Sequence, residues 1–295
     1  EIYTLSLHDA LPIYILLDLL FIVGFHMGAA GAAVATIIAQ GVSGILCLIY
    51  IIAKIPVLHL NRNDLHAGKD VYGIQLKIGL PMALQYSITA IGSMMVQSSL
   101  NILGSTLVAA FTAAGKIEQV VTQAYVAMGT TMATYSAQNM GAGSVKRIRE
   151  GFRANTIIGI IYSLVAAAFV MTVGKYMTYL FVSEDVDLIM NSVDIYLKCI
   201  GLFFIPLTVV NIYRNGIQGL GYGLLPMMAG VAELIGRGIV AVIAGNMRSY
   251  TGVCLAGPAA WVLAGGLLLV MYFYIMNVHM KKIFGTNGKD RKEAE

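Results

Sequence analysis

Charged side chains are scarce in this sequence. Asp, Glu, Lys and Arg together make up 12% of the 295 residues, about half of the roughly 25% that is usual in soluble domains. Hydrophobic residues account for 58% of the chain, and the mean hydropathy is +0.78. A soluble fold of this size has too little interior to bury so much apolar surface. The composition therefore excludes a soluble enzyme, a nucleic-acid-binding module and a disordered chain, and it predicts a protein whose solvent is lipid.

Catalytic and metal-binding motifs are also missing. The three cysteines, Cys47, Cys199 and Cys254, lie far apart without a CxxC spacing, which argues against a disulfide framework or a zinc site. The five histidines are scattered, and no GxxxxGKS/T, HExxH or GxSxG pattern occurs. We therefore expect no metal, no cofactor, no enzymatic activity and no direct use of ATP.

Long apolar runs are what the sequence has in abundance. A run of about 20 apolar residues crosses a bilayer as a helix, because a helix satisfies its backbone hydrogen bonds within one segment. Seven complete runs cover 28–53, 78–98, 106–137, 155–180, 188–212, 224–247 and 252–280, and a shorter run covers 14–26. We predict an all-α integral membrane protein, a polytopic helical bundle of about eight transmembrane helices.

Lysine and arginine are concentrated in a few connecting segments. The segments 54–77 and 138–153 are basic, and so is the tail from Lys281 onward, whereas 174–187 carries one lysine and three acids. The positive-inside rule then predicts that the basic segments and the C-terminus are cytoplasmic. We expect a multi-pass protein of the plasma (inner) membrane.

The first thirteen residues, EIYTLSLHDALPI, do not blend into the apolar run that follows. They are typical of translated sequencing-adapter sequence at the end of an incomplete gene read. We interpret 1–13 as a non-native stretch; the alternative is a genuine polar N-terminus. A signal peptide is disfavoured because the stretch has no basic n-region.

Five strings of residues occur along the chain in a characteristic order. They are LDLLFI at 17–22, GLP at 79–81, QNMGAG at 138–143, YRNGIQGLG at 213–221 and ELIGR at 233–237. Their order and spacing resemble the multidrug and toxic compound extrusion (MATE) family, and the resemblance covers about residues 14–284. It implies twelve spans in two six-helix bundles, with a substrate cleft between the bundles.

The resemblance also implies how the chain is divided. Residues 14–54 would hold spans five and six, the end of the N-terminal bundle, and 55–77 would be the cytoplasmic loop between the bundles. Residues 78–284 would form the complete C-terminal bundle, spans seven to twelve, and 285–295 a cytoplasmic tail. On this interpretation the chain is a C-terminal fragment that lacks half of the cleft.

The function that the resemblance implies is secondary active efflux. The family exports organic cations and other amphipathic compounds in exchange for Na⁺ or H⁺. The expected partners are drug-like small molecules and membrane lipids, without nucleic acid, and the full-length form is expected to be a monomer. Some branches carry a coupling glutamate in span seven and an aspartate in span ten. This chain has Thr89 and Leu207 near those positions, so ion coupling must use other groups or lie in the missing half.

Ionisable residues inside the spans are the first functional candidates, because each costs about 2.5–3.5 kcal/mol at the centre of a span. Glu233 and Arg237 are four residues apart and share one helix face. Glu233 either exchanges an ion or meets a cationic substrate, or it forms a structural pair with Arg237, and the sequence leaves both open. Glu118 also lies near a span centre, beside Gln119, which favours a cavity-lining role.

Uncharged polar residues and glycines supply the other candidates. Polar side chains in spans often bond between helices, so a structural role remains open for each of them. Candidates for the cavity are Gln85, Tyr86, Asn211 and the acid Asp18. The segment 214–226 is rich in glycine and could act as a hinge or cytoplasmic gate, with Arg214, Gln218, Gly219 and Gly221 as its candidates.

Two other functions remain as alternatives. A flippase of lipids or lipid-linked saccharides, from the related superfamily, would need a more cationic cleft than these mixed charges provide. A membrane-embedded scaffold without transport activity would not need acids near the span centres.

Overall fold

The computed structural model describes residues 12–56, 68–180 and 186–280. Residues 1–11 of the predicted non-native stretch, 57–67 of the predicted inter-bundle loop and the whole predicted tail lie outside these residues. The chain divides into two compact units, Glu1–Tyr72 and Gly73–Glu295. Every element in the described residues is helical, which confirms the predicted all-α fold.

The first unit is a hairpin of two apolar helices. Pro12–Gly24 is helical, and its second half, η1 (Leu19–Gly24), is wound as a π-helix. After a short turn, α2 (Gly28–Lys54) follows. The buried positions of α2 are all small, Gly31, Ala35 and Ala39. Small residues let two backbones approach closely in lipid, where no hydrophobic effect drives helices together.

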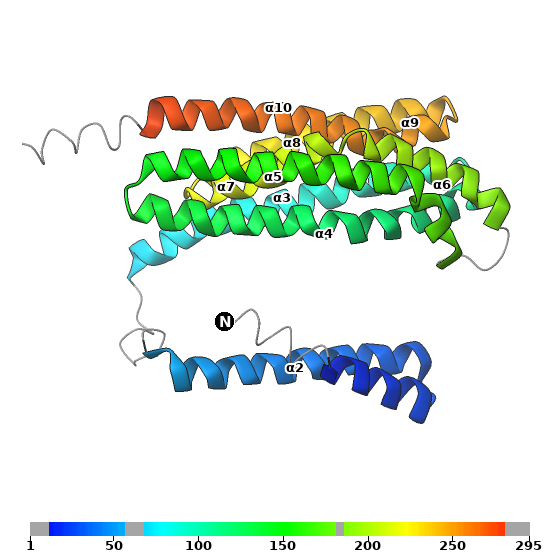
Figure 1. Ribbon diagram of the computed structural model, residues 1–295, viewed down its shortest axis with the longest axis horizontal. Helices are drawn as coiled ribbons and strands as arrows, with labels where there is room; N and C mark the ends of the chain where they lie inside the picture. The colour runs from blue at the N-terminus through cyan, green and yellow to red at the C-terminus, as the bar shows by residue number, and fades with distance from the viewer. Residues whose placement is uncertain (1–11, 57–67, 181–185, 281–295) are drawn as a thin grey trace, which may run out of the picture. The chain divides into compact units, whose positions relative to one another are not determined.

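The second unit is a bundle of long helices. Its elements are α3 (Lys69–Asn101), α4 (Ser105–Gly141), α5 (Val145–Thr172), η3 (Gly174–Leu180), α6 (Val186–Gly201), α7 (Phe204–Gly219), α8 (Leu224–Asn246), α9 (Tyr250–Cys254), α10 (Ala256–Tyr274) and η4 (Ile275–His279). The long helices run side by side along one direction (Figure 1). α7 packs on α4, α5, α8 and α10 and is therefore the inner helix of the bundle.

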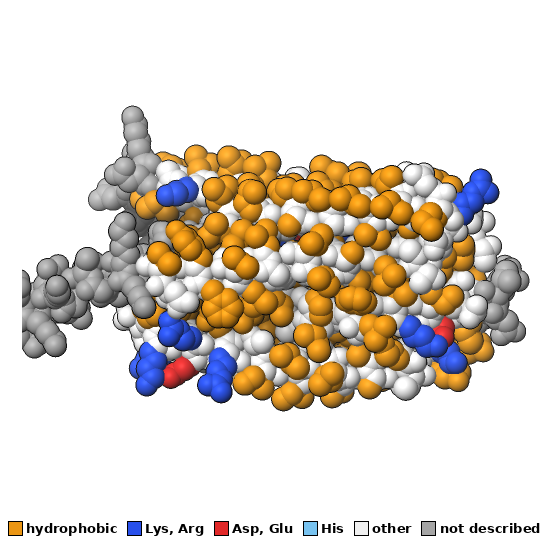
Figure 2. Space-filling model, turned by 90° about the horizontal axis from the view of Figure 1, so that it is seen from above, with side chains coloured by type: hydrophobic (Ala, Val, Ile, Leu, Met, Phe, Trp, Pro, Cys, Tyr) orange, Lys and Arg blue, Asp and Glu red, His pale blue; other side chains and the backbone are white. Residues whose placement is uncertain are grey.

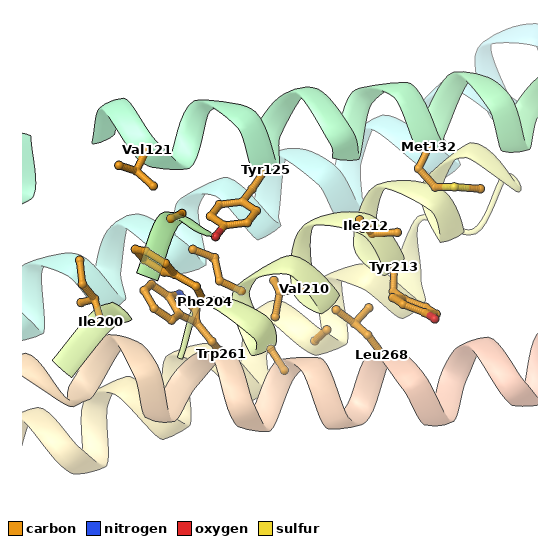
Figure 3. Close-up of a cluster of buried hydrophobic side chains, with 14 of the residues drawn as sticks. Val121, Tyr125, Met132, Ile200, Phe204, Val210, Ile212, Tyr213, Trp261 and Leu268 are labelled. Atoms are coloured by element: carbon orange, nitrogen blue, oxygen red, sulfur yellow. The ribbon is translucent and has the colours of Figure 1, made fainter. Parts of the chain in front are cut away.

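Aromatic and aliphatic side chains fill the space around α7 (Figure 3). Tyr125 of α4 and Phe204 of α7 are buried, with ring centroids 5.8 Å apart. Polar side chains join the helices as well: the hydroxyl oxygens of Ser163 on α5 and Thr208 on α7 lie 2.6 Å apart, fully buried. Such bonds replace the hydrogen bonds with water that lipid cannot offer.

The outer surface of this bundle suits a membrane. Figure 2 shows hydrophobic side chains over the middle of one face and Lys and Arg near its two ends. Four helices or helix runs in the described residues are long and apolar enough to span: Gly28–Lys54, Val145–Thr172, Leu224–Asn246 and Tyr250–Val278. A bent helix pair makes a possible fifth. The predicted count of about eight spans is not confirmed, since α3 and α4 are not among the helices that are long and apolar enough to span.

Two helices joined at a bend take the place of the predicted single span 188–212. The segments Ile189–Gly201 and Phe204–Gly219 meet at an angle of 53°. Pro206 explains the break, because its ring clashes with the carbonyl four residues earlier and it has no N–H to donate. It is tolerated in the first turn of α7, where an N–H has no intrahelical partner.

Two predicted boundaries also shift. α5 begins at Val145 rather than near residue 155, because the basic stretch 145–153 is helical and continuous with the apolar part. α3 begins at Lys69, so the last residues of the predicted 55–77 loop belong to its first turns.

Candidate functional site

A cavity of about 290 Å³ lies inside the second unit. Side chains from α3, α4, α6, α8, α9 and α10 line it. Its charged lining groups are the carboxylate of Glu118 and the guanidinium of Arg237, and its walls include the rings of Phe111, Tyr196 and Trp261. The cavity thus brings together an acid and a base that the sequence separates by more than a hundred residues.

The Glu118 carboxylate has a single hydrogen-bond partner among the described residues. The Tyr196 hydroxyl donates to Oε2 of Glu118 at 2.5 Å. Phe111 meets the Tyr196 ring edge-on, with centroids 4.6 Å apart and planes at 73°, so packing fixes the orientation of the donor. The second carboxylate oxygen has no hydrogen-bond partner among the described residues.

Glu233 lies in a different environment, between two guanidinium groups. Nη2 of Arg214 is 2.6 Å from its Oε2, and Nη2 of Arg237 is 2.7 Å from its Oε1. All three side chains are largely buried, with exposed fractions of 14%, 12% and 7% for Arg214, Arg237 and Glu233. The expected shared face of Glu233 and Arg237 is confirmed by this contact.

The trio has a net charge of +1 and incomplete hydrogen bonding. The Nε atoms of Arg214 and Arg237 are buried without a hydrogen-bond partner among the described residues. Nη1 of Arg237 donates to the Ser93 hydroxyl at 3.2 Å. Arg237 therefore connects the cavity to the buried carboxylate: its guanidinium contacts Glu233 on one side and lines the cavity on the other.

A second polar contact extends this network toward the far end of α7. Nε2 of Gln218 donates to Oε1 of Gln85 at 3.1 Å, and the Gln85 side chain is buried. Arg214 and Gln218 are one turn apart on α7, so one face of that helix carries both groups. The expected role of Arg214 at a hinge or gate stays a prediction; its guanidinium pairs with Glu233 within the bundle.

At two positions at the end of α7, close packing or backbone conformation favours glycine. A Cβ at Gly219 would lie 2.2 Å from the carbonyl oxygen of Ala133 on α4, so no larger residue fits without moving a backbone. Gly221 follows with φ of +90°, a conformation that favours glycine. These positions set how closely α7 approaches α4 and how the chain turns into α8.

The remaining sequence candidates are not brought into the cavity. Tyr86 is 69% exposed, and Gln119 is exposed on α4. The Asn211 side chain donates to the Leu207 carbonyl of its own helix at 3.0 Å. Asp18 belongs to the first unit, where its Oδ1 is buried without a partner among the described residues.

Three residues of the site were not expected from the sequence. Ser93, Tyr196 and Trp261 all line the cavity. The sequence offered one signal for them, since Trp261 is its single tryptophan. A serine or tyrosine inside an apolar run is common in membrane helices and points to no site by itself.

Comparison with known sequences gives matches over most of the chain. The family model MatE matches residues 80–243, more than half of the sequence. "Probable multidrug resistance protein YpnP" of Bacillus subtilis is 34% identical over 199 residues, which is 67% of this chain and 43% of that protein. "Multidrug export protein MepA" of Staphylococcus haemolyticus is 21% identical over 280 residues, 95% of this chain and 53% of that protein. The chain thus spans about half the length of these curated relatives.

A solved structure shares the fold. A transporter of the MOP superfamily from Pyrococcus furiosus superposes with a TM-score of 0.85 at 20% sequence identity, over 92% of this chain and 62% of that one. Its title attributes to that protein a binding pocket of reversed polarity and a different function. Ser93, Glu118, Tyr196 and Arg237 of the present chain lie within the residues matched by the family model.

Proposed function

This chain belongs to the MATE family of multidrug efflux transporters, and from that premise we propose that it acts in secondary active antiport. The proposed cargo is organic cations or amphipathic compounds, exchanged for Na⁺ or H⁺. Names of relatives such as YpnP and MepA, which refer to multidrug resistance and export, support a drug-like substrate. The protein is a multi-pass membrane protein; we propose the plasma membrane, a cytoplasmic C-terminus and a monomer.

The observation that carries the proposal is the cavity itself. It combines one carboxylate, Glu118, with aromatic walls that include Tyr196 and Trp261. A carboxylate beside aromatic faces attracts organic cations by charge and by cation–π contact. The same carboxylate can bind a Na⁺ ion or a proton, so one group can serve cargo and coupling ion in alternation.

The contacts of the two central acids favour Glu118 as the exchanging group. Both oxygens of Glu233 already contact guanidinium groups, at 2.6 and 2.7 Å, so a cation would have to displace an arginine to reach them. Glu118 holds a neutral hydroxyl at one oxygen and lines the cavity. We therefore propose that Glu118 exchanges the ion and that Glu233 positions Arg237, which acts on Glu118 through its charge across the cavity.

The test is efflux of a cationic dye from cells that express the complete product of the gene, with Na⁺ and pH gradients imposed separately. We expect one gradient to drive export and Glu118→Gln to abolish the driven part, since the amide cannot change charge. Asp194→Asn is the matched control, because it removes a carboxylate that lies on α6, pairs with Lys198 at 2.5 Å and does not line the cavity.

Each result has a defined meaning. If Na⁺ alone drives export, Glu118 is a sodium ligand; if only the pH gradient does, it carries the proton. Export by the Glu118→Gln protein at the rate of the unaltered protein, at matched abundance in the membrane, would refute the role of Glu118. Absence of gradient-driven export by the unaltered protein would refute the antiport itself.

A further inference from the structure

A second hollow lies away from the central cavity, where α5 begins. It has a volume of about 650 Å³ and is lined by the first turns of α5 together with residues of α7 and α10. We call it the α5 groove. Its basic lining residues are Lys146, Arg149 and Arg153, and its apolar lining includes Ile157 and Phe273.

The basic side chains of the α5 groove are aligned and largely uncompensated. Residues 146, 149 and 153 follow the helical spacing that puts side chains on one face. Glu150 is the one acid in the lining, and it reaches Lys146 at 3.9 Å with both side chains mostly exposed, a contact of little energetic weight. Arg149 and Arg153 form no salt bridge with any described residue. The groove therefore has a net charge of +2.

Polarity changes along the groove from charged to apolar. Ile157 lies one turn beyond Arg153 on α5 and is 49% exposed, and Phe273 on α10 is 58% exposed. The floor is made by the buried rings of Tyr213 and Tyr272. The hydroxyl oxygens of Thr156 and Tyr213 lie 3.3 Å apart, in hydrogen-bond contact. Charge is at the helix start, and exposed apolar surface follows toward the middle of the span.

This order of groups matches one kind of membrane component. We propose that the α5 groove binds an anionic phospholipid, with the phosphate at Arg149 and Arg153 and an acyl chain against Ile157 and Phe273. Guanidinium groups bind phosphate by paired hydrogen bonds, and basic pockets between transmembrane helices suit anionic head groups. A free inorganic anion would use the arginines but leave the apolar wall without a ligand.

The experiment measures which lipid the purified full chain retains. The protein in detergent is incubated with equal amounts of phosphatidylglycerol and phosphatidylcholine, washed, and examined by native mass spectrometry. We expect the unaltered protein to retain phosphatidylglycerol in preference to phosphatidylcholine. Each basic contact near the head group is expected to contribute roughly fivefold to this preference, so Arg149→Gln lowers it about fivefold and Arg149→Gln/Arg153→Gln about 30-fold.

The control is Arg147→Gln, which removes the same charge two residues away but outside the groove lining. Because exposed charges at a distance are screened by salt, we expect it to change the preference by less than about twofold. Equal retention of both lipids by the unaltered protein would overturn the proposal, and so would an equal loss in the 147 and 149 variants. Displacement of the lipid by excess inorganic phosphate would identify a free-anion site instead. The result is independent of transport, because retention is measured without a gradient.

Discussion

Glu118 and Glu233 occupy similar places in the sequence, each deep in a long helix, yet their surroundings differ. Glu118 has one neutral hydrogen-bond donor and lines a cavity. Glu233 is buried and holds two arginines. Two acids that each lie deep in a helix can thus have opposite surroundings. We propose that the groups facing each acid decide whether it exchanges a ligand or fixes neighbouring helices.

Among the substitutions that test this difference between the two acids, Glu233→Gln is expected to have the largest effect. It leaves Arg214 and Arg237 buried without their counter-charge, and breaking a buried pair in this way costs about 3–5 kcal/mol. We expect a large fall in the thermal unfolding temperature of the purified protein and a loss of dye export. Unchanged stability with lost export would show instead that Glu233 acts as an ion carrier.

Gly219→Ala tests the position of α7, the helix that carries Arg214 to Glu233. The new methyl group would meet the Ala133 carbonyl oxygen and push α7 away from α4, at a cost of about 1–3 kcal/mol for overpacking. We expect a lower unfolding temperature. Gly115→Ala on α4, whose Cβ would have no neighbour within 4 Å, is the control and should leave the temperature unchanged or slightly raised.

Tyr196→Phe tests the surroundings of the other acid, Glu118. It removes the single hydroxyl donor of Glu118 but keeps the ring against Phe111. The expected stability loss is about 1 kcal/mol, much smaller than for Glu233→Gln. The apparent affinity for the coupling ion, measured by varying ion concentration in the efflux assay, should shift. An unchanged ion dependence would show that the Tyr196 hydroxyl has no part in exchange.

Ser93→Ala should have the smallest effect. The Ser93 hydroxyl accepts one hydrogen bond from Arg237 at 3.2 Å, and the residue is exposed. We expect a loss of about 0.5–1 kcal/mol, measured as thermal unfolding, and nearly full export. A loss comparable to that of Glu233→Gln would mean that Arg237 depends on α3 rather than on Glu233 for its position.

The sequence predicted much of the fold because lipid imposes simple rules. Apolar runs such as 224–247 had to be helices, and α8 matches that run closely. The i,i+4 spacing of Glu233 and Arg237 was enough to predict their shared face. The bend near Pro206 was not predicted. The apolar run reads the same whether the proline lies inside one continuous helix or in the first turn of a second helix.

Contacts between distant helices could not be predicted in the same way. Nothing in the spacing of Arg214 and Glu233, on different helices, indicates a 2.6 Å contact. Tyr196 was not predicted as a site residue, because its role depends on a contact between α6 and Glu118 on α4 that the sequence does not reveal. Local periodicity describes one helix at a time, whereas a site between helices depends on how their faces are rotated against one another.

The sequence alone determined that this is a helical membrane protein with two acids deep in long helices, because hydropathy and helical periodicity act locally along the chain. The tertiary structure decided which acid is neutralised by arginines and which lines a cavity. That choice depends on packing: α7 approaches α8 closely enough for Arg214 to reach Glu233, while Tyr196 and Trp261 line a cavity together with Glu118. Charges interact more strongly away from bulk water than in it, so such contacts set the charge that each group presents to a ligand.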